Sequence, residues 1–272
     1  MSEYGSIANT PLPRTRTSLA ADFRRLGIAR GNIVLVHASL SRIGWVAGGP
    51  VAVIEALGDA IGDSGTLVMP AHSADWTDPA RWQAPPVPAD WIELIRAEMP
   101  AFDPERTPTR NMGRIAELFR SWPGVRRSDH PACSFAARGP LAETILADHA
   151  LESPLGEGSP LARLYELDAH ILLLGVGLER CTMLHLAEQR AWPGRRSHVE
   201  GAAMLVEGRR QWVFYRTPPL VDADHFLSLS TPLQAANLVR TGMAGSAPCL
   251  LLPARTLVDF AVDAWSGMPL PE

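Results

Sequence analysis

Lysine is absent from this 272-residue chain, and all 25 of its basic residues are arginines. The absence excludes a P-loop, which needs a lysine beside the phosphates, and it excludes the lysine-containing signature of protein kinases. It also excludes a lysine Schiff base or a lysine nucleophile. Proton or acyl transfer by this protein must therefore use histidine, carboxylate, hydroxyl or thiol side chains.

Cysteine is also scarce. Cys133, Cys181 and Cys249 are widely spaced, so they form neither a disulfide framework nor a Cys-x-x-Cys zinc motif. Free thiols are typical of a reducing compartment, and we expect a cytoplasmic protein. No apolar run approaches the roughly 20 residues of a membrane span, and residues 1–13 lack the pattern of a secretory signal. The net charge of −4 argues against nucleic acid as a partner.

Apolar and amphipathic segments alternate along the chain and predict a single α/β domain over 1–272. An apolar run at 32–37, a helix at 51–61 and a second run at 66–70 form a βαβ unit. We expect a mixed, largely parallel central sheet flanked by helices, with sites at the carboxyl ends of the strands. The other expected elements are a loose arm at 1–16, helices at 17–26, 111–119, 140–147, 159–167, 182–190, 227–241 and 255–265, a strand at 170–174, and a hairpin of 201–206 with 211–216.

The segment 71–109 interrupts this alternation. It contains three tryptophans and seven prolines, and tryptophan is uncommon in disordered segments. Residues 71–105 alone carry seven acidic residues and two arginines, a net charge of −5. The composition predicts a structured substrate loop that attracts a cationic ligand.

The strongest candidate site lies at 173–188, where a buried strand leads through a Gly-x-Gly turn into a helix. Thr182, His185 and Glu188 recur every three residues, so they share one helix face. A histidine beside a carboxylate is a typical general base, and Thr182 can donate a hydrogen bond to an oxygen that gains negative charge. The same spacing is also typical of an ordinary polar helix face.

Two further segments, and one cysteine within 173–188, contain candidate ligand contacts. The small residues at 36–41 (VHASLS) form either a nest of backbone N–H groups for phosphate or a plain turn. Asp222 and Asp224 alternate, so they can converge on a metal or an ammonium ion, or one of them can cap a helix. Cys181, next to a helix start, is either a reactive thiol or a packed one.

The order of these segments closely resembles that of the aminoglycoside 3-N-acetyltransferases. The blocks are VHASLSRIG, GGP with VIEAL, GTLVMP, FDPERTPT, MGRIAELF, RRSDHPACSFAARG, SPLARLYELDAHILLLGVG and TMLHLAE. The resemblance extends from about Leu19 to the C-terminus and is densest at 34–70 and 126–188. It implies direct transfer of an acetyl group from acetyl-CoA to the 3-amino group of the 2-deoxystreptamine ring of an aminoglycoside antibiotic, without a metal, and hence antibiotic resistance. Relatives with this fold indicate a homodimer.

The resemblance also implies roles for individual residues. His185 is the general base, Glu188 orients it, and Thr182 faces the thioester carbonyl. The implied coenzyme-binding residues are His37, Ala38, Ser39, Leu40, Ser41, Thr109, Arg110, Met112, Gly113 and Ser134. The implied contacts of the antibiotic are Asp75 or Asp78 with Trp76, and the pair Asp222 and Asp224. Two features depart from the family: Cys181 replaces the usual asparagine or valine, and the loop at 71–105 is longer and richer in tryptophan.

Other functions stay open at this point. The acceptor can be another amine, such as an amino sugar or an antibiotic precursor. The chain can also be a drug-sequestering protein with a relic coenzyme site. A fourth alternative is a metallohydrolase that uses His130, Asp222, Asp224 and His225, although no HxH or HExxH spacing occurs.

Overall fold

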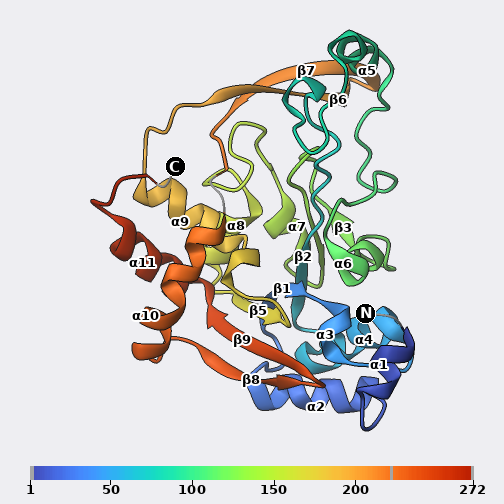
Figure 1. Ribbon diagram of the computed structural model, residues 1–272, viewed down its shortest axis with the longest axis vertical. Coiled ribbons are helices and arrows are strands. Elements are labelled where there is room, and N and C mark those ends of the chain that lie inside the picture. Colours follow the sequence, from blue (N-terminus) through green and yellow to red (C-terminus); the bar gives the residue numbers. More distant parts are fainter. Residues whose placement is uncertain (1–2, 221–222, 271–272) are drawn as a thin grey trace.

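A mixed sheet forms the centre of the computed structural model, which describes residues 3–220 and 223–270 (Figure 1). Its strands are β1 (Ile33–Ala38), β2 (Thr66–Pro70), β3 (Arg126–Arg127), β4 (Phe135–Arg138), β5 (His170–Leu174), β8 (Arg240–Ala244) and β9 (Ala247–Pro253). Their order across the described part of the sheet is β3-β4-β2-β1-β5-β9-β8. The three central strands β2, β1 and β5 are parallel, and the outer strands pair antiparallel. An α/β fold is therefore confirmed, whereas the expectation of a largely parallel sheet is wrong.

Helices cover both faces of the sheet. On one face lie α2 (Arg16–Leu26), α3 (Leu40–Ile43), α4 (Gly49–Ile61) and α6 (Gly113–Arg120). On the other lie α7 (Ala142–Leu146), α8 (Pro160–Glu166), α9 (Met183–Ala191), α10 (Ser230–Ala235) and α11 (Ala254–Trp265). The 3-10 helices η3 (Leu178–Arg180) and η4 (Ala223–Leu229), of three and seven residues, precede α9 and α10.

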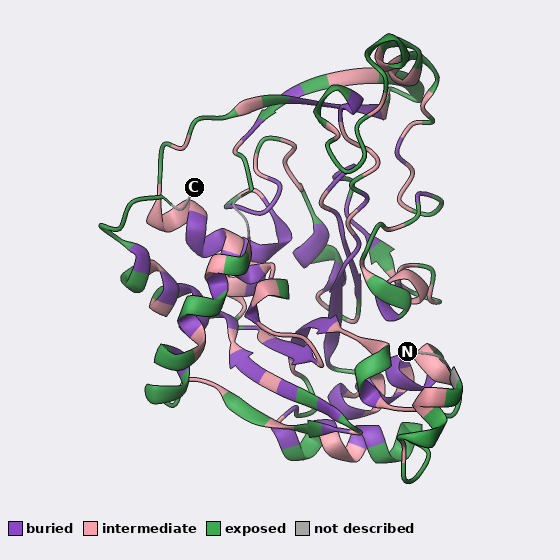
Figure 2. Cartoon of the chain, viewed as in Figure 1, coloured by how far each residue is buried: buried purple, intermediate pink, exposed green. Residues whose placement is uncertain are grey.

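The apolar run of β1 explains this three-layer arrangement. Successive side chains of a strand point to opposite faces of the sheet, so a strand that is apolar throughout feeds two cores. Ile33 and Leu35 belong to the core beneath α7–α11, whereas Val34 and Val36 belong to the core beneath α2, α4 and α6. Figure 2 shows the result, with the central strands buried between the helical layers.

Three expected segments differ from the structure. The segment 227–241 was expected to be one helix, but α10 ends at Ala235, Asn237 adopts a positive φ of 56°, and β8 begins at Arg240. Strands β3, β4 and β9 were not predicted: β3 and β4 are only two and four residues long, and alanine and proline flank the leucines of β9. The arm at 1–16 contains helix α1 (Glu3–Ala8), and the backbone of Arg14 hydrogen-bonds to Trp45 and Ala47, so the described part of this arm is not loose.

The long segment 71–109 has secondary structure of its own. It contains the 3-10 helices η1 (Pro79–Arg81) and η2 (Ala89–Trp91) and the helix α5 (Ile92–Glu98). It packs on a separate two-stranded hairpin of β6 (His198–Val206) and β7 (Arg209–Thr217), which lies beside α5 in Figure 1. The backbone N–H of Phe102 donates to Ala203 O at 2.7 Å, and that of Asp78 donates to Glu200 Oε1 at 2.6 Å. The expectation of a structured segment is confirmed.

A buried arginine joins the two ends of this segment to the edge of the sheet. Arg127 on β3 is 9% exposed, and its guanidinium lies 5.0 Å from the ring centre of Phe102. Its N–H groups donate to Ala71 O (2.6 Å), Ser73 Oγ (2.8 Å), Thr107 O (2.5 Å) and Ser134 Oγ (2.9 Å). Burial lowers the pKa of Arg127 to about 10, which still leaves it charged at neutral pH. The guanidinium therefore closes the segment 71–109 into a loop.

Substitution of this arginine by lysine tests that closure. We expect Arg127→Lys to lower the free energy of unfolding by about 2–4 kcal/mol, because one ammonium cannot serve all four charge-assisted acceptors. The matched control is Arg126→Lys, since Arg126 is 66% exposed and forms only a surface ion pair with Glu143; about 0.5 kcal/mol or less is expected there. Urea unfolding of both variants measures the difference, and equal losses would contradict this account of Arg127.

Candidate active site

A cavity of about 780 Å³ opens at the carboxyl ends of the three parallel strands. Ligand sites of α/β sheets typically lie at this edge. The lining residues from the strands, the turns after them and the start of α3 are Val36, His37, Ala38, Ser39, Leu40, Ser41, Met69, Pro70 and Val176. The lining residues on the other helices or just before them are Asn111 to Ala116, Glu179 to Thr182, His185 and Phe226. The cavity therefore brings together residues from five separate segments of the chain, within 36–41, 69–70, 111–116 and 176–185 and at 226.

The histidine and glutamate of α9 form a tight pair on the wall of this cavity. His185 Nδ1 lies 2.6 Å from Glu188 Oε2. The Glu188 side chain is 1% exposed and that of His185 is 11% exposed. An ionised carboxylate only accepts hydrogen bonds, so the proton of a neutral His185 is on Nδ1 and the lone pair is on Nε2. The ring of Phe226 packs edge-on against His185 at 5.1 Å between centroids. The arrangement is that of an oriented general base.

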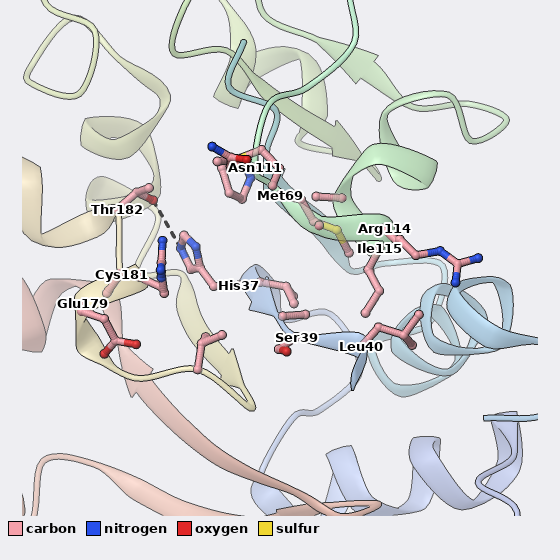
Figure 3. A pocket seen from close by; sticks show the side chains of 18 of the residues that line it. His37, Ser39, Leu40, Met69, Asn111, Arg114, Ile115, Glu179, Cys181 and Thr182 are labelled. Atoms are coloured by element: carbon pink, nitrogen blue, oxygen red, sulfur yellow. Dashed lines mark hydrogen bonds between the residues drawn. The ribbon is translucent and has the colours of Figure 1, made fainter. Parts of the chain in front are cut away.

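A second histidine faces the threonine at the start of α9. His37 ends the buried part of β1, and its Nε2 lies 3.3 Å from Thr182 Oγ1, as the dashed line in Figure 3 marks. Burial, with a smaller contribution from His185, lowers the pKa of His37 to about 3. His37 is therefore neutral at physiological pH. It fixes the hydroxyl of Thr182 without adding a positive charge next to the base.

The opposite wall of the cavity presents backbone N–H groups and arginines. Residues 113–116, the first turn of α6, line the cavity, and Met112 at the N-cap supplies no side-chain hydrogen bond. Unsatisfied N–H groups at a helix start favour a phosphate. Gly113 has a φ of +82°, a conformation that suits glycine. Arg114 on α6 and Arg180 on η3, which precedes α9, are exposed cations that line the cavity, and neither was predicted from the sequence.

Comparison with known proteins identifies the family of this chain. Residues 35–266 match the family model described as aminoglycoside 3-N-acetyltransferase. The chain belongs to the aminoglycoside 3-N-acetyltransferase family. The resemblance inferred from the sequence is thereby confirmed. The family comprises acetyl-CoA-dependent N-acetyltransferases.

Individual relatives cover almost the whole chain. The SPbeta prophage-derived aminoglycoside N(3')-acetyltransferase-like protein YokD of Bacillus subtilis is 44% identical over 95% of this chain and 94% of its own length. Its crystal structure superposes with a TM-score of 0.94, covering 97% and 98% of the two chains at 42% identity. Aminoglycoside N(3)-acetyltransferase VII of Streptomyces paromomycinus is 38% identical over 97% of this chain and 96% of its own.

Two further solved structures contain ligands. The binary complex of AAC-IIIb with CoASH has a TM-score of 0.83 and 35% identity, covering 96% of this chain and 100% of that one. AAC-VIa bound to sisomicin has a TM-score of 0.82 and 30% identity, covering 93% and 97% of the two chains. The fold of this family member is therefore one that accommodates both a coenzyme and an aminoglycoside in its relatives.

Three residues that the resemblance implied in coenzyme binding lie outside the cavity lining. Thr109 donates both its backbone N–H and its hydroxyl to Glu117, at 2.8 and 2.7 Å. Arg110 pairs with Asp75 at 2.6 Å. Ser134 is fully buried and bonds Arg127 and Ala71 O. These three side chains stabilise the loop 71–109 and its neighbours.

The acidic side chains of the loop are largely paired within the protein. Four of its seven acids form ion pairs with arginines: Asp75 with Arg110 (2.6 Å), Asp78 with Arg96 (2.7 Å), Glu93 with Arg96 (2.7 Å) and Asp103 with Arg106 (3.6 Å). Asp78, one of the two acids implied to contact the antibiotic, is buried with both oxygens on Arg96. Trp76 donates its indole N–H to Pro100 O at 3.0 Å. The net charge of −5 counted from the sequence therefore overestimates the negative charge that this loop presents to a ligand.

The remaining candidates have mixed outcomes. Asp222 lies outside the described residues, and Asp224 is exposed on η4. Cys181 is 1% exposed, and burial raises its pKa to about 12, which favours packing over reactivity. Within 3–220 and 223–270, no three His, Cys, Asp or Glu side chains converge closely enough to hold a metal ion. None of the helices in these ranges is long and apolar enough to cross a bilayer.

Buried histidines make the stability of this protein sensitive to acid. Burial lowers the pKa to about 3 for His37, His72 and His130, and to about 4 for His149, from the ordinary value of 6.5. Below pH 6.5 the unfolded chain therefore binds protons that the folded chain does not, and the free energy of unfolding falls as the pH falls. Each histidine contributes a slope of up to about 1.4 kcal/mol per pH unit between its two pKa values.

Urea unfolding between pH 7.5 and 4.5 measures this slope. Carboxylates such as Glu117, whose pKa is lowered to about 2 chiefly by bonds from Arg120 and Thr109 against the effect of burial, act mainly below this window. We expect His149→Gln to reduce the slope by about one proton relative to the unsubstituted protein. A free energy of unfolding that does not change between pH 7 and 5 would contradict the assignment of neutral buried histidines.

Proposed function

We propose that the protein transfers the acetyl group of acetyl-CoA directly to the 3-amino group of the 2-deoxystreptamine ring of an aminoglycoside, and so confers resistance to it. The observation that carries this proposal is the 2.6 Å bond between His185 Nδ1 and the buried Glu188, on the wall of a cavity at the carboxyl ends of parallel strands. Family membership supports the reaction class, and the relatives with CoASH and sisomicin support the two ligands.

The residues of one cavity wall fit coenzyme A. Its pyrophosphate is an anion that the N–H groups of the first turn of α6 and the hydroxyls of Ser39 and Ser41 can bind. Arg114 and Arg180 provide mobile positive charge for its phosphates. When bound, acetyl-CoA supplies the activated acetyl group as a thioester.

The residues of the other wall fit proton removal from an amine. An amine attacks a carbonyl only when it is neutral, so a base must take its proton. Nε2 of His185 bears the lone pair, and Glu188 stabilises the imidazolium that forms. The hydroxyl of Thr182 can donate to the oxygen that gains negative charge, together with N–H groups at the start of α9. The buried, protonated Cys181 offers no competing nucleophile.

Acidic and aromatic side chains are proposed to bind the acceptor. Asp224 on η4, two residues before the cavity residue Phe226, is proposed to bind an ammonium group that does not react. Asp75 and Trp76 are proposed as further contacts, in addition to their bonds to Arg110 and to Pro100 O. The pairing of loop acids with arginines favours a second candidate, an acceptor with fewer charges such as an amino sugar or an antibiotic precursor.

A panel of acceptors tests the proposed reaction. Purified protein is mixed with acetyl-CoA, a thiol reagent and 4,5- or 4,6-disubstituted aminoglycosides, and the acetylated position is assigned by NMR. We expect thiol release that depends on the aminoglycoside and a product acetylated at N3. Release only with simple amino sugars would replace the aminoglycoside by the second candidate, and tight binding without release would favour a sequestering protein.

Substitution of the base tests its role. We expect His185→Gln to lower kcat by about 10²- to 10⁴-fold, because the amide cannot accept the amine proton, with little change in the Kd of coenzyme A. His170→Gln is the matched control, since His170 begins β5 at the end away from the cavity. Retained turnover in His185→Gln would remove His185 from the role of base.

A further inference from the structure

The carboxylate of Glu188 has a second histidine neighbour. Its Oε2 accepts from His185 Nδ1, and its Oε1 lies 3.3 Å from Nε2 of His225. The two histidines come from different elements, since His185 is on α9 and His225 is on η4. A carboxylate that is 1% exposed thus lies between two imidazole rings.

Aromatic rings enclose this second contact. The ring of His225 has its centroid 4.5 Å from that of Phe226, 5.1 Å from that of Trp265 and 6.1 Å from that of Trp192. Trp192 and Trp265 stack on each other at 5.4 Å. A carboxylate oxygen buried among apolar rings is costly unless a donor faces it. At 3.3 Å, Nε2 of His225 is close enough to become that donor in the tautomer with its proton on Nε2, although the geometry of the structure falls short of a hydrogen bond.

The same short element connects this contact to the cavity. Phe226 follows His225 directly, lines the cavity, and packs against the ring of His185. Arg195 is a further charged group close to Glu188, whose carboxylate opposes the lowering of the pKa of Arg195 by burial. Arg195 lies after α9 and donates to Pro219 O. The second carboxylate oxygen of Glu188 is faced by His225 of η4.

We infer that His225 is a positioning residue for acetyl transfer. Its Nε2–H holds Oε1 of Glu188, so that Oε2 stays on Nδ1 of His185 and Nε2 of His185 stays turned to the amine. The inference rests on the proposed function, and it adds to the base and its carboxylate a third member from a distant part of the chain. In metal sites, loss of a partner that orients an imidazole in this way lowers metal affinity or activity by about 10- to 100-fold.

Three substitutions of His225 separate a role in positioning from a role in packing. His225→Phe keeps an aromatic ring and removes the donor. His225→Gln places an amide N–H near the position of Nε2, whereas His225→Asn places it near Nδ1, where it cannot reach Oε1. We expect kcat to fall about tenfold in the Phe and Asn variants, with the KM of both substrates nearly unchanged, and Gln to restore most of the loss.

A measurement without substrate distinguishes this inference from the proposed function. The proton on Nδ1 of His185 gives a downfield resonance in ¹⁵N-histidine-labelled protein when it is bonded to a carboxylate. We expect that resonance to shift or broaden in His225→Phe and His225→Asn and to persist in His225→Gln. This resonance tests the role of His225 even if no amine on the panel is acetylated. If His225→Phe does not fold, the comparison of His225→Gln with His225→Asn still tests that role. An unchanged resonance in Asn, or equal loss in Gln and Asn, would overturn the role of His225.

Discussion

The hydrogen bond between His185 and Glu188 is the interaction on which the account of the site depends. A buried carboxylate is stable only if donors face it, and His185 supplies one at 2.6 Å. The bond sets the tautomer of the imidazole, and the tautomer decides which nitrogen can take a proton. His37 is neutral because it is buried, so it orients Thr182 without competing for that proton.

The topology of the sheet brings this pair to the right place. Three parallel strands end at one edge, and the segments that follow β1 and β5 supply the loop of small residues and the start of α9. The antiparallel strands at either side widen the platform on which α9 and α11 pack. Arg127 bonds both ends of the loop 71–109 to the edge of the sheet. The loop also contacts the hairpin of β6 and β7.

Local features of the fold and of the site could be predicted from the sequence, and distant pairings could not. The strands at 33–38, 66–70 and 170–174 are continuous apolar runs, and the spacing of His185 and Glu188 is a helical repeat, so both follow from neighbours in the chain. The pairing of Asp78 was not predicted, because its partner Arg96 lies 18 residues further along the same loop and its contact Glu200 lies on β6. His225 was considered only for a metal site, since nothing local places it 3.3 Å from Glu188.

The tautomer of His185 is the most direct test of the central claim, and ¹⁵N NMR of histidine-labelled protein at neutral pH measures it. In neutral His185 the account predicts a protonated Nδ1, with the chemical shift of an N–H nitrogen, and an Nε2 with the shift of a nitrogen that bears a lone pair. A proton found on Nε2 of neutral His185, with Nδ1 bare, would contradict the claim that Glu188 orients this histidine as the base.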